Sequence, residues 1–414
     1  TFLDSPRESK TTMSPAVGGL AGHETGGPAD GRTAEAKSRL ARWLRVPPPA
    51  QPVARWYVSP VVDALAYHWS WLLILVPLLC MGDRHPADYR LLLLLVVAGN
   101  FTHQAVSLPF VYLDREVFAR HRRRVTVLPL VLLVLFAGSV VYWKLEQPAE
   151  FPTFRWFILA VGAVAYSWNF WHVYMQKYGI LRLYNAKAGE PDAPKVPGWV
   201  DRLLVFAWLP LTIVVVATNH GAFLVYTYAH MGPVIAPVLG FVDRWAWLIM
   251  PASVALVAGS LATFLLHEAR VNGLRNAPRL SMGLGMTLLS ASIVTLNPIK
   301  AVIAFGFSHV LEYFVFVWAY QRRYYHAPLP HRPVLGRLLG HPALAFGGFI
   351  LVVGGAYFVV NSWSYLLPKT ARPVVAGVPL ATILALLAIY QSMVHFYFDG
   401  FLWKMRRPQV RAHL

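Results

Sequence analysis

The residues best suited to chemistry lie inside apolar stretches, where polar side chains are costly. Two such stretches are WNFWHVYMQKYG at 168–179 and GNFTHQ at 99–104. Both contain the spacing Asn-Phe-x-His. Their polar members are Asn100, His103, Asn169, His172, Gln176 and Lys177. Such groups inside a membrane cost several kcal/mol unless they are paired, hydrated or bound to metal, which makes them functional candidates.

Two further histidines are each accompanied by a carboxylate on the same helix. His309 and Glu312 are three residues apart, and His395 and Asp399 are four residues apart. Residues with these spacings share one face of a helix, so each pair can point in the same direction. An imidazole beside a carboxylate at this spacing is typical of metal sites in helical bundles.

The pattern predicts a metal centre with non-haem di-iron as the first choice. Imidazole suits iron, zinc and copper, whereas carboxylates favour harder ions. The predicted ligands are His103, His172, His309, His395, Glu312 and Asp399, with both carboxylates also serving in catalysis. We expect Asn100, Asn169 and Gln176 to orient the imidazoles, and Tyr313 and Trp168 to form cavity walls. Two irons of this kind activate oxygen against C–H bonds.

Three other interpretations use the same residues. Three histidines could hold a zinc ion whose bound water attacks a substrate, with a carboxylate as base. Paired histidines could be axial ligands of a haem, or could form a proton relay in a transporter, although a transporter more often contains inverted repeats. Isolated membrane histidines often only form hydrogen bonds between helices.

Several classes of site are missing from the sequence. There is no phosphate-binding glycine loop, no dinucleotide fingerprint and no HExxH motif. The compact histidine boxes of membrane desaturases are also absent, so the likeness to those enzymes concerns chemistry and not family. The single cysteine, Cys80, excludes internal disulfides and thiolate clusters. Nucleic-acid binding is not expected despite a net charge of +18, because the basic residues gather between apolar runs.

These residues must be positioned by membrane-spanning helices. Of the 414 residues, 57% are hydrophobic and only 14% are charged, against about a quarter in soluble proteins. We predict an all-α polytopic bundle of about ten spans within one domain, 51–414, preceded by a disordered basic arm, 1–50. The spans are roughly 57–82, 87–112, 125–143, 155–178, 203–220, 244–267, 280–297, 298–320, 342–361 and 376–403. The Gly- and Pro-broken stretch 221–241 is an additional span or a re-entrant piece.

The charge of the loops predicts the orientation. Basic segments such as DREVFARHRRR, 114–124, are expected to face the cytoplasm, which places both termini inside. At about 1.5 Å per residue, His103, His309 and His395 then lie roughly 18, 20 and 14 Å from the first basic residue beyond them. His172 reaches this depth if Arg182 marks the boundary of its span. The four helices run in the same direction, so we expect their histidines to lie at one level.

The remaining histidines are weaker candidates. His267, beside Glu268, is expected at the cytoplasmic edge, and His68 toward the outer half of the first span. Those outside the spans, or in the doubtful stretch, are His121, His220, His230, His326, His331 and His341.

The expected setting is a bacterial inner membrane. A metal site near the cytoplasmic side can receive a lipid or isoprenoid substrate from the bilayer, and membrane lipids surround the chain. It can receive electrons from a soluble donor at the basic loops. The sequence therefore predicts a membrane-bound oxygenase, desaturase or hydroxylase.

Overall fold

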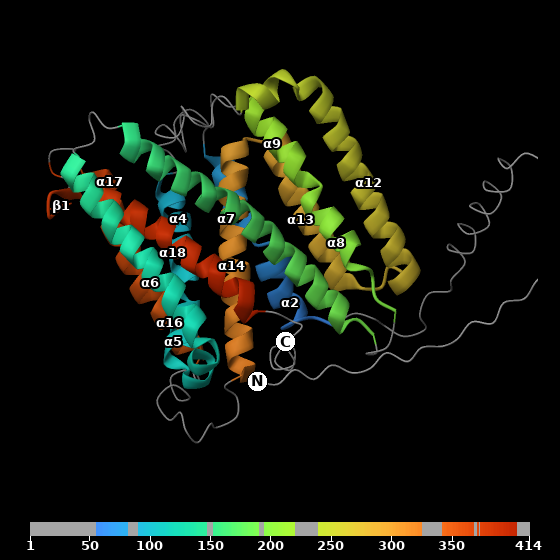
Figure 1. Cartoon of the computed structure of the whole chain (residues 1–414). Helices are drawn as coiled ribbons and strands as arrows, with labels where there is room; N and C mark the ends of the chain where they lie inside the picture. The colour runs from blue at the N-terminus through green and yellow to red at the C-terminus, as the bar shows by residue number, and fades with distance from the viewer. Residues whose placement is uncertain are drawn as a thin grey trace, which may run out of the picture. The chain divides into compact units, whose positions relative to one another are not determined.

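The computed structural model describes residues 55–81, 90–146, 152–189, 194–219, 239–324, 342–367, 371 and 373–403, and almost all of them are helical (Figure 1). The predicted arm, 1–50, and most of the doubtful stretch, 221–241, lie outside these residues. The all-α membrane class is confirmed by the described part of the chain.

The first helical segment is bent. It comprises α2 (Pro60–Asp63), a π-helical turn (Ala64–His68) and α3 (Leu72–Cys80), with a 53° bend before α3. The next helices are α4 (Arg90–Ala105), α5 (Ser107–Leu113), α6 (Arg115–Glu146), α7 (Pro152–Lys187), α8 (Gly198–Phe206) and α9 (Trp208–Thr218).

The second half continues the helical pattern. Its helices are α12 (Ala246–Asn272), α13 (Ala277–Thr295), α14 (Pro298–Tyr324), α16 (Pro342–Phe349), α17 (Gly355–Leu366) and α18 (Leu380–Leu402), with a π-helical turn (Ile350–Gly354) joining α16 to α17. A small antiparallel pair, β1 (Val374–Val375) and β2 (Val378–Pro379), precedes α18.

Fewer helices qualify as spans than the ten predicted. In the described residues, seven helical segments are long and apolar enough to cross a membrane, or eight if the bent α2–α3 pair is counted as one span. The helices α7 and α13 coincide with the predicted spans 155–178 and 280–297 but are not among these segments. Both carry polar residues that the site and its surroundings use, which lowers their apolar character.

One predicted loop is a helix. The basic segment 114–124 forms the first turns of α6, so this part of the loop prediction is wrong. Asp114 explains the difference, because its Oδ1 accepts hydrogen bonds from the backbone N–H groups of Glu116 and Val117 and so caps the helix. The arginines that follow favour the helical state.

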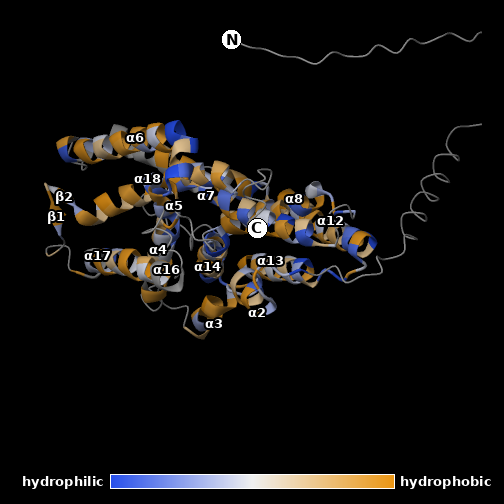
Figure 2. Cartoon of the chain, turned by 90° about the horizontal axis from the view of Figure 1, so that it is seen from below, coloured by the Kyte–Doolittle hydropathy of each residue, from blue (hydrophilic) through white to orange (hydrophobic). Residues whose placement is uncertain are grey.

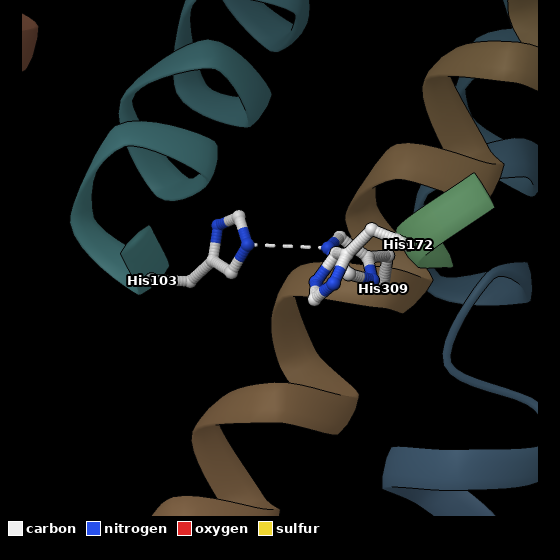
Figure 3. A group of neighbouring side chains, drawn as sticks. All are labelled: His103, His172 and His309. Carbon is white, nitrogen blue, oxygen red and sulfur yellow. Dashed lines mark hydrogen bonds between the residues drawn. The ribbon is translucent and has the colours of Figure 1, made fainter. Parts of the chain in front are cut away.

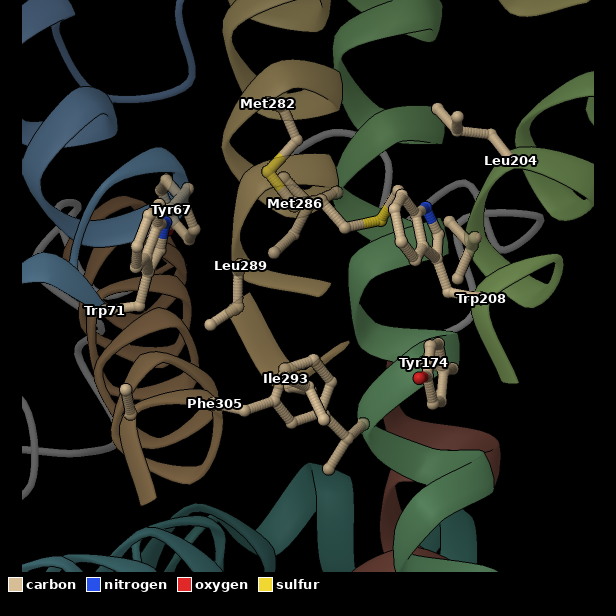
Figure 4. Packing of buried hydrophobic residues seen from close by; sticks show 14 of the residues in the cluster. Tyr67, Trp71, Tyr174, Leu204, Trp208, Met282, Met286, Leu289, Ile293 and Phe305 are labelled. Atoms are coloured by element: carbon tan, nitrogen blue, oxygen red, sulfur yellow. The ribbon is translucent and has the colours of Figure 1, made fainter. Parts of the chain in front are cut away.

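Tight helix packing defines the interior. Met282, Met286 and Leu289 of α13 interdigitate with Trp208 of α9 and with side chains of α7 and α14 (Figure 4). The outer faces of α3, α6 and α17 are largely apolar (Figure 2). This combination of a packed interior and an apolar exterior suits a protein in lipid, where van der Waals packing drives helix association.

One close approach requires glycine. A Cβ at Gly285 of α13 would lie 2.2 Å from the backbone oxygen of His68. Real carbon atoms cannot come so close to an oxygen, so α13 and the π-helical turn can meet only because position 285 has no side chain. Small residues at such crossings are common in membrane bundles.

Candidate metal centre

Four helices each contribute one histidine to a single cluster. His103 comes from α4, His172 from α7, His309 from α14 and His395 from α18. The helix α14 packs against α4, and α18 packs against both α4 and α7 (Figure 1). These contacts bring the four imidazoles together in the interior.

The imidazoles face one another through the same ring atom. His309 Nε2 lies 3.1 Å from His103 Nε2, and His395 Nε2 lies 3.3 Å from His172 Nε2. Figure 3 shows the rings of His103, His172 and His309 directed toward a common region. Four basic nitrogens therefore converge in space although they are far apart in sequence.

The two pairs form one group. The ring centroids of His103 and His395 are 4.8 Å apart, and those of His172 and His309 are 5.1 Å apart. Three of the residues are essentially buried, whereas the His172 side chain is 10% exposed. Burying four imidazoles without a binding partner for their nitrogens is costly, because each nitrogen loses its hydration.

The separations match those of ligands on one metal ion. Two nitrogens held at about 2.0–2.1 Å from an ion are about 2.8–3.4 Å apart when the angle between them is roughly 90–110°. The observed separations of 3.1 and 3.3 Å lie within this interval. Two overlapping groups of donor atoms, His103–His172–His309 and His172–His395–Asp399, each fit within 4.8 Å.

Asp399 lies at the edge of the cluster. Its Oδ2 is 3.7 Å from the Nε2 atoms of both His172 and His395. Its Oδ1 accepts hydrogen bonds from the Tyr313 hydroxyl at 2.7 Å and from Trp403 Nε1 at 3.0 Å. One oxygen is thus fixed by neighbours while the other faces the imidazoles.

Glu312, a predicted ligand, is held by three neighbouring side chains. Its Oε1 accepts hydrogen bonds from Lys177 and from Ser308, the latter at 2.7 Å, and its Oε2 accepts one from Gln176 at 3.1 Å. The Lys177–Glu312 ion pair is buried on both sides. Among the described residues, neither compact group of metal-donor atoms contains Glu312.

The three predicted orienting residues have different surroundings. Gln176 donates a hydrogen bond to the backbone oxygen of His309 at 3.0 Å, so it contacts the main chain of that residue. The Oδ1 atom of Asn169 is buried and has no hydrogen-bond partner among the described residues. Asn100 is half-buried on α4, one turn before His103. Of the predicted cavity walls, Tyr313 is buried, whereas Trp168 is 40% exposed.

The weaker histidine candidates described by the structure lie elsewhere. His267 Nδ1 is 2.9 Å from the backbone oxygen of Thr263, and its ring meets Trp199. His68 contacts the hydroxyls of Ser281 and Tyr184. His121 packs beside Phe401. The other five, His220, His230, His326, His331 and His341, lie outside the described residues.

A buried ion-pair network was not anticipated. Arg279 of α13 is fully buried and pairs with Asp201 of α8 and Glu268 of α12. Arg182 of α7 also pairs with Asp201. Two arginines and two carboxylates balance in charge, so this network links four helices without a net charge. Its residues are far apart in sequence, and periodicity alone offers no signal for such pairing.

The charge around the cluster favours a cation. Lys177 and Glu312 neutralise each other, so Asp399 contributes the nearest uncompensated negative charge if it is ionised. A divalent ion bound by neutral imidazoles and one carboxylate would carry a net charge of about +1, which a buried site tolerates far better than a bare ion.

Comparison of the chain with models of known protein families, with curated proteins and with solved structures gives no match. The function must therefore be argued from the site itself.

Proposed function

We propose that this chain is an integral membrane metalloenzyme that binds one redox-active ion and oxidises an apolar, lipid-like substrate. The observation that carries the proposal is the convergence of four buried imidazole nitrogens, two pairs of which are 3.1 and 3.3 Å apart. Iron is the proposed metal because imidazole suits it and the neighbouring carboxylate adds a hard oxygen donor. Bound iron would supply oxygen activation for oxygenation, desaturation or hydroxylation.

One ion fits the donors better than the two expected from the sequence. Two-metal sites hold their ions about 3.5–4 Å apart and need ligands for both. With Glu312 engaged by Lys177, the cluster retains four imidazoles and Asp399. These donors form two overlapping triads that share His172, and we propose that the side chains close on one ion, which would leave room for one more ligand in an octahedral arrangement.

The alternatives fit less well. Catalytic zinc is usually held by three protein ligands with an open fourth position, whereas four imidazoles would fill a tetrahedral zinc site. Two axial histidines of a haem must lie on opposite faces of the macrocycle, with their nitrogens about 4 Å apart at ligand distances of about 2.0 Å. The pairs at 3.1 and 3.3 Å are too close for a porphyrin to lie between them.

The exposed edge of the cluster supports a substrate that arrives from lipid. His172 and Asp399 have side chains that are 10% and 12% exposed, whereas the other three histidines are essentially buried. Beside this edge, Phe396 lies over the His172 ring and stacks with Trp168, which is itself 40% exposed. An approaching molecule therefore meets aromatic rings before the imidazoles, as suits a lipid or isoprenoid chain.

Residues near the site have separable roles in this proposal. His103, His172, His309 and His395 bind the ion, and Asp399 either completes its ligands or accepts a proton from the substrate. The hydrogen bonds from Tyr313 and Trp403 hold the Asp399 carboxylate in place. The basic helix ends would face the cytoplasm of a bacterium and receive a soluble electron donor.

Elemental analysis of detergent-purified protein tests the metal. Wild type should contain about one iron per chain, and the His172→Ala, His395→Ala double variant should lose it because two of its ligands are gone. His267→Ala is the matched control, since His267 is a membrane histidine outside the cluster. Protein that takes up no iron under chelator-free reconstitution would refute the proposal, and stoichiometric zinc with no iron uptake would shift it to another metal chemistry.

Oxygen consumption tests the redox step. Iron-loaded wild type with a chemical reductant and extracted membrane lipids should consume oxygen, and the double variant should not. Mass spectrometry of the lipids then identifies any oxidised class. Iron binding without lipid-dependent oxygen consumption would support the metal centre and reject the proposed reaction.

A further inference from the structure

A continuous series of oxidisable side chains leaves the metal centre. The first is Tyr313, whose ring centroid is 4.9 Å from that of His395 and 5.5 Å from that of His103. Its hydroxyl accepts a hydrogen bond from Trp403 Nε1 at 3.1 Å. Tyr313 is buried, and it contacts two predicted ligands on one side and an indole on the other.

The series continues to the end of α14. The Trp403 ring is 5.0 Å from that of Tyr320, and Tyr320 is stacked on Tyr324 at 5.7 Å and 16°. Tyr320 is buried, whereas Trp403 and Tyr324 are half-buried. The path Tyr313–Trp403–Tyr320–Tyr324, here called the aromatic path, thus leads from the interior toward the surface.

Two phenylalanines pack along the path. Phe110 contacts Trp403, Tyr320 and Tyr324, and Phe316 contacts Trp403. Phenylalanine is much harder to oxidise than tyrosine or tryptophan, so these residues insulate the path and exclude water from it. Packing alone would be satisfied by phenylalanine at positions 313, 320 and 324 as well.

The outer end of the path is strongly basic. The last turn of α14 contains Arg322 and Arg323, and Arg120 near the start of α6 acts electrostatically on Tyr320. Three more arginines, at 122–124, follow on α6. Positive charge at this point favours the docking of an acidic partner.

We propose that the aromatic path carries single electrons from an acidic, one-electron donor protein at the basic end of α14 to the metal centre. This inference rests on the proposed redox function of the same site. Each hop spans one ring contact and involves side chains that form radicals.

The electron balance is simple. With an oxidised ion bound, Tyr313 would give up one electron, and its phenolic proton would move along its hydrogen bond to Asp399 Oδ1. Tyr313 would then regain an electron from Trp403, and the proton would return. Trp403 would be reduced by Tyr320, Tyr320 by Tyr324, and Tyr324 by the donor protein, which is oxidised by one electron; Tyr320 and Tyr324 would each pass the phenolic proton to a neighbouring acceptor on oxidation and take it back on reduction, so that no net proton moves. No bond between heavy atoms forms or breaks.

A light-triggered experiment tests the path independently of any natural donor. The single cysteine, Cys80, is replaced by serine, and Arg120→Cys introduces an exposed attachment site for a ruthenium polypyridyl label near Tyr320. Flash excitation with a soluble oxidative quencher makes the label a one-electron oxidant. Optical decay of the oxidised label and freeze-quench electron paramagnetic resonance then follow the oxidising equivalent.

The expected result differs with metal loading. In chelator-treated protein, a tyrosyl radical should form at Tyr313 and disappear in Tyr313→Phe. In protein loaded with reduced iron, the iron should become oxidised instead. Tyr320→Phe keeps the aromatic ring but removes the hydroxyl group. It should slow the arrival of the oxidising equivalent at Tyr313 or at the iron by at least about tenfold, equivalent to a barrier about 1.4 kcal/mol higher.

The control is Tyr397→Phe on α18. The Tyr397 ring contacts Phe398 and Phe401, so Tyr397 lies beside the path but not in it. Unchanged kinetics in Tyr320→Phe, or no radical at Tyr313, would overturn the aromatic path even if the protein binds iron. A Tyr320-dependent radical in protein that binds no metal would instead keep the path and reject the proposed metal function.

Discussion

The buried pair formed by Lys177 and Glu312 offers the sharpest test of how the site is built. Lys177→Met removes the ammonium group and leaves the Glu312 carboxylate in the interior. We expect the free energy of unfolding to fall by about 3–5 kcal/mol, the usual cost of breaking a buried ion pair from one side. The lower value is more appropriate here, because Ser308 and Gln176 still donate hydrogen bonds to the carboxylate.

The opposite variant should cost more. Glu312→Gln leaves the Lys177 ammonium with neutral partners, which are the new amide oxygen, the Ser308 hydroxyl at 3.0 Å and the Phe305 ring at 5.5 Å. None carries a compensating charge, although the ring face attracts a cation weakly. We therefore expect a loss near 5 kcal/mol, or a folded population that is lower by about three to four powers of ten relative to the unfolded state.

The double variant Lys177→Met, Glu312→Gln distinguishes pairing from independent roles. Removing both charges leaves no isolated ion, so the double variant should be more stable than Glu312→Gln alone. Its cost should fall short of the sum of the single costs by at least about 2 kcal/mol, because the two residues interact directly. Lys187→Met, at a half-buried position on the same helix, is the control and should cost less than about 1 kcal/mol.

Unfolding in mixed micelles, followed by circular dichroism during titration with SDS, measures these differences. Iron content is determined on the same samples, and Glu312→Gln should retain its iron as long as it is folded. Additive costs in the double variant would refute the ion-pair reasoning. Loss of iron from a folded Glu312→Gln protein would instead restore Glu312 as a ligand.

Two further predictions concern the helices that support the site. Gly285→Ala should strongly destabilise the bundle, because its Cβ would lie 2.2 Å from the His68 backbone oxygen and α13 would have to move. The midpoint of unfolding in the SDS titration measures this loss. Arg279→Met should cost about 3–5 kcal/mol, since Glu268 would remain buried without its guanidinium partner while Asp201 keeps Arg182. Partial restoration of the midpoint by Glu268→Gln in the same protein would check this.

The convergence of the histidines could be anticipated from the sequence. Helices cross a membrane at nearly fixed rise per residue, so the distance of a histidine from the first basic residue estimates its depth. His103, His309 and His395 lie at similar estimated depths on helices that were expected to run in one direction. The structure brings all three together with His172. That they bind metal stays a prediction.

The different surroundings of the two carboxylates could not be anticipated. Glu312 follows His309 by three residues and Asp399 follows His395 by four, so each lies about one turn from a histidine on its own helix. What separates them is the rotation of α7, which directs Lys177 toward Glu312, and the position of Trp403, which fixes one oxygen of Asp399. The Lys177 contact joins two distant helices, and periodicity within one helix contains no information about it; Trp403 follows Asp399 by four residues, so that contact does agree with helical spacing.

The count of about ten spans stays a prediction, and two of the predicted spans are more polar than the others. Apolar runs identify segments that lipid accepts, but α7 and α13 carry Lys177 and Arg279 in their interiors. These charges are compensated by partners on other helices, Glu312 for the first and Asp201 with Glu268 for the second. A polar helix can therefore lie inside a bundle although it is not apolar enough to count as a span by itself.

The number of ions follows from the same contacts and can be measured directly. Because Lys177 holds Glu312 away from the cluster, the imidazoles and Asp399 provide five donors, and we expect the titration of metal-free protein with Co²⁺ to end at one equivalent per chain. The Co²⁺ absorption should show one set of ligand-field bands, and His103→Ala should shift or remove them, since one imidazole of the closest pair is gone. An end point at two equivalents, with magnetic coupling between the ions, would contradict this reasoning, because it would require Glu312 to leave Lys177 and become a ligand.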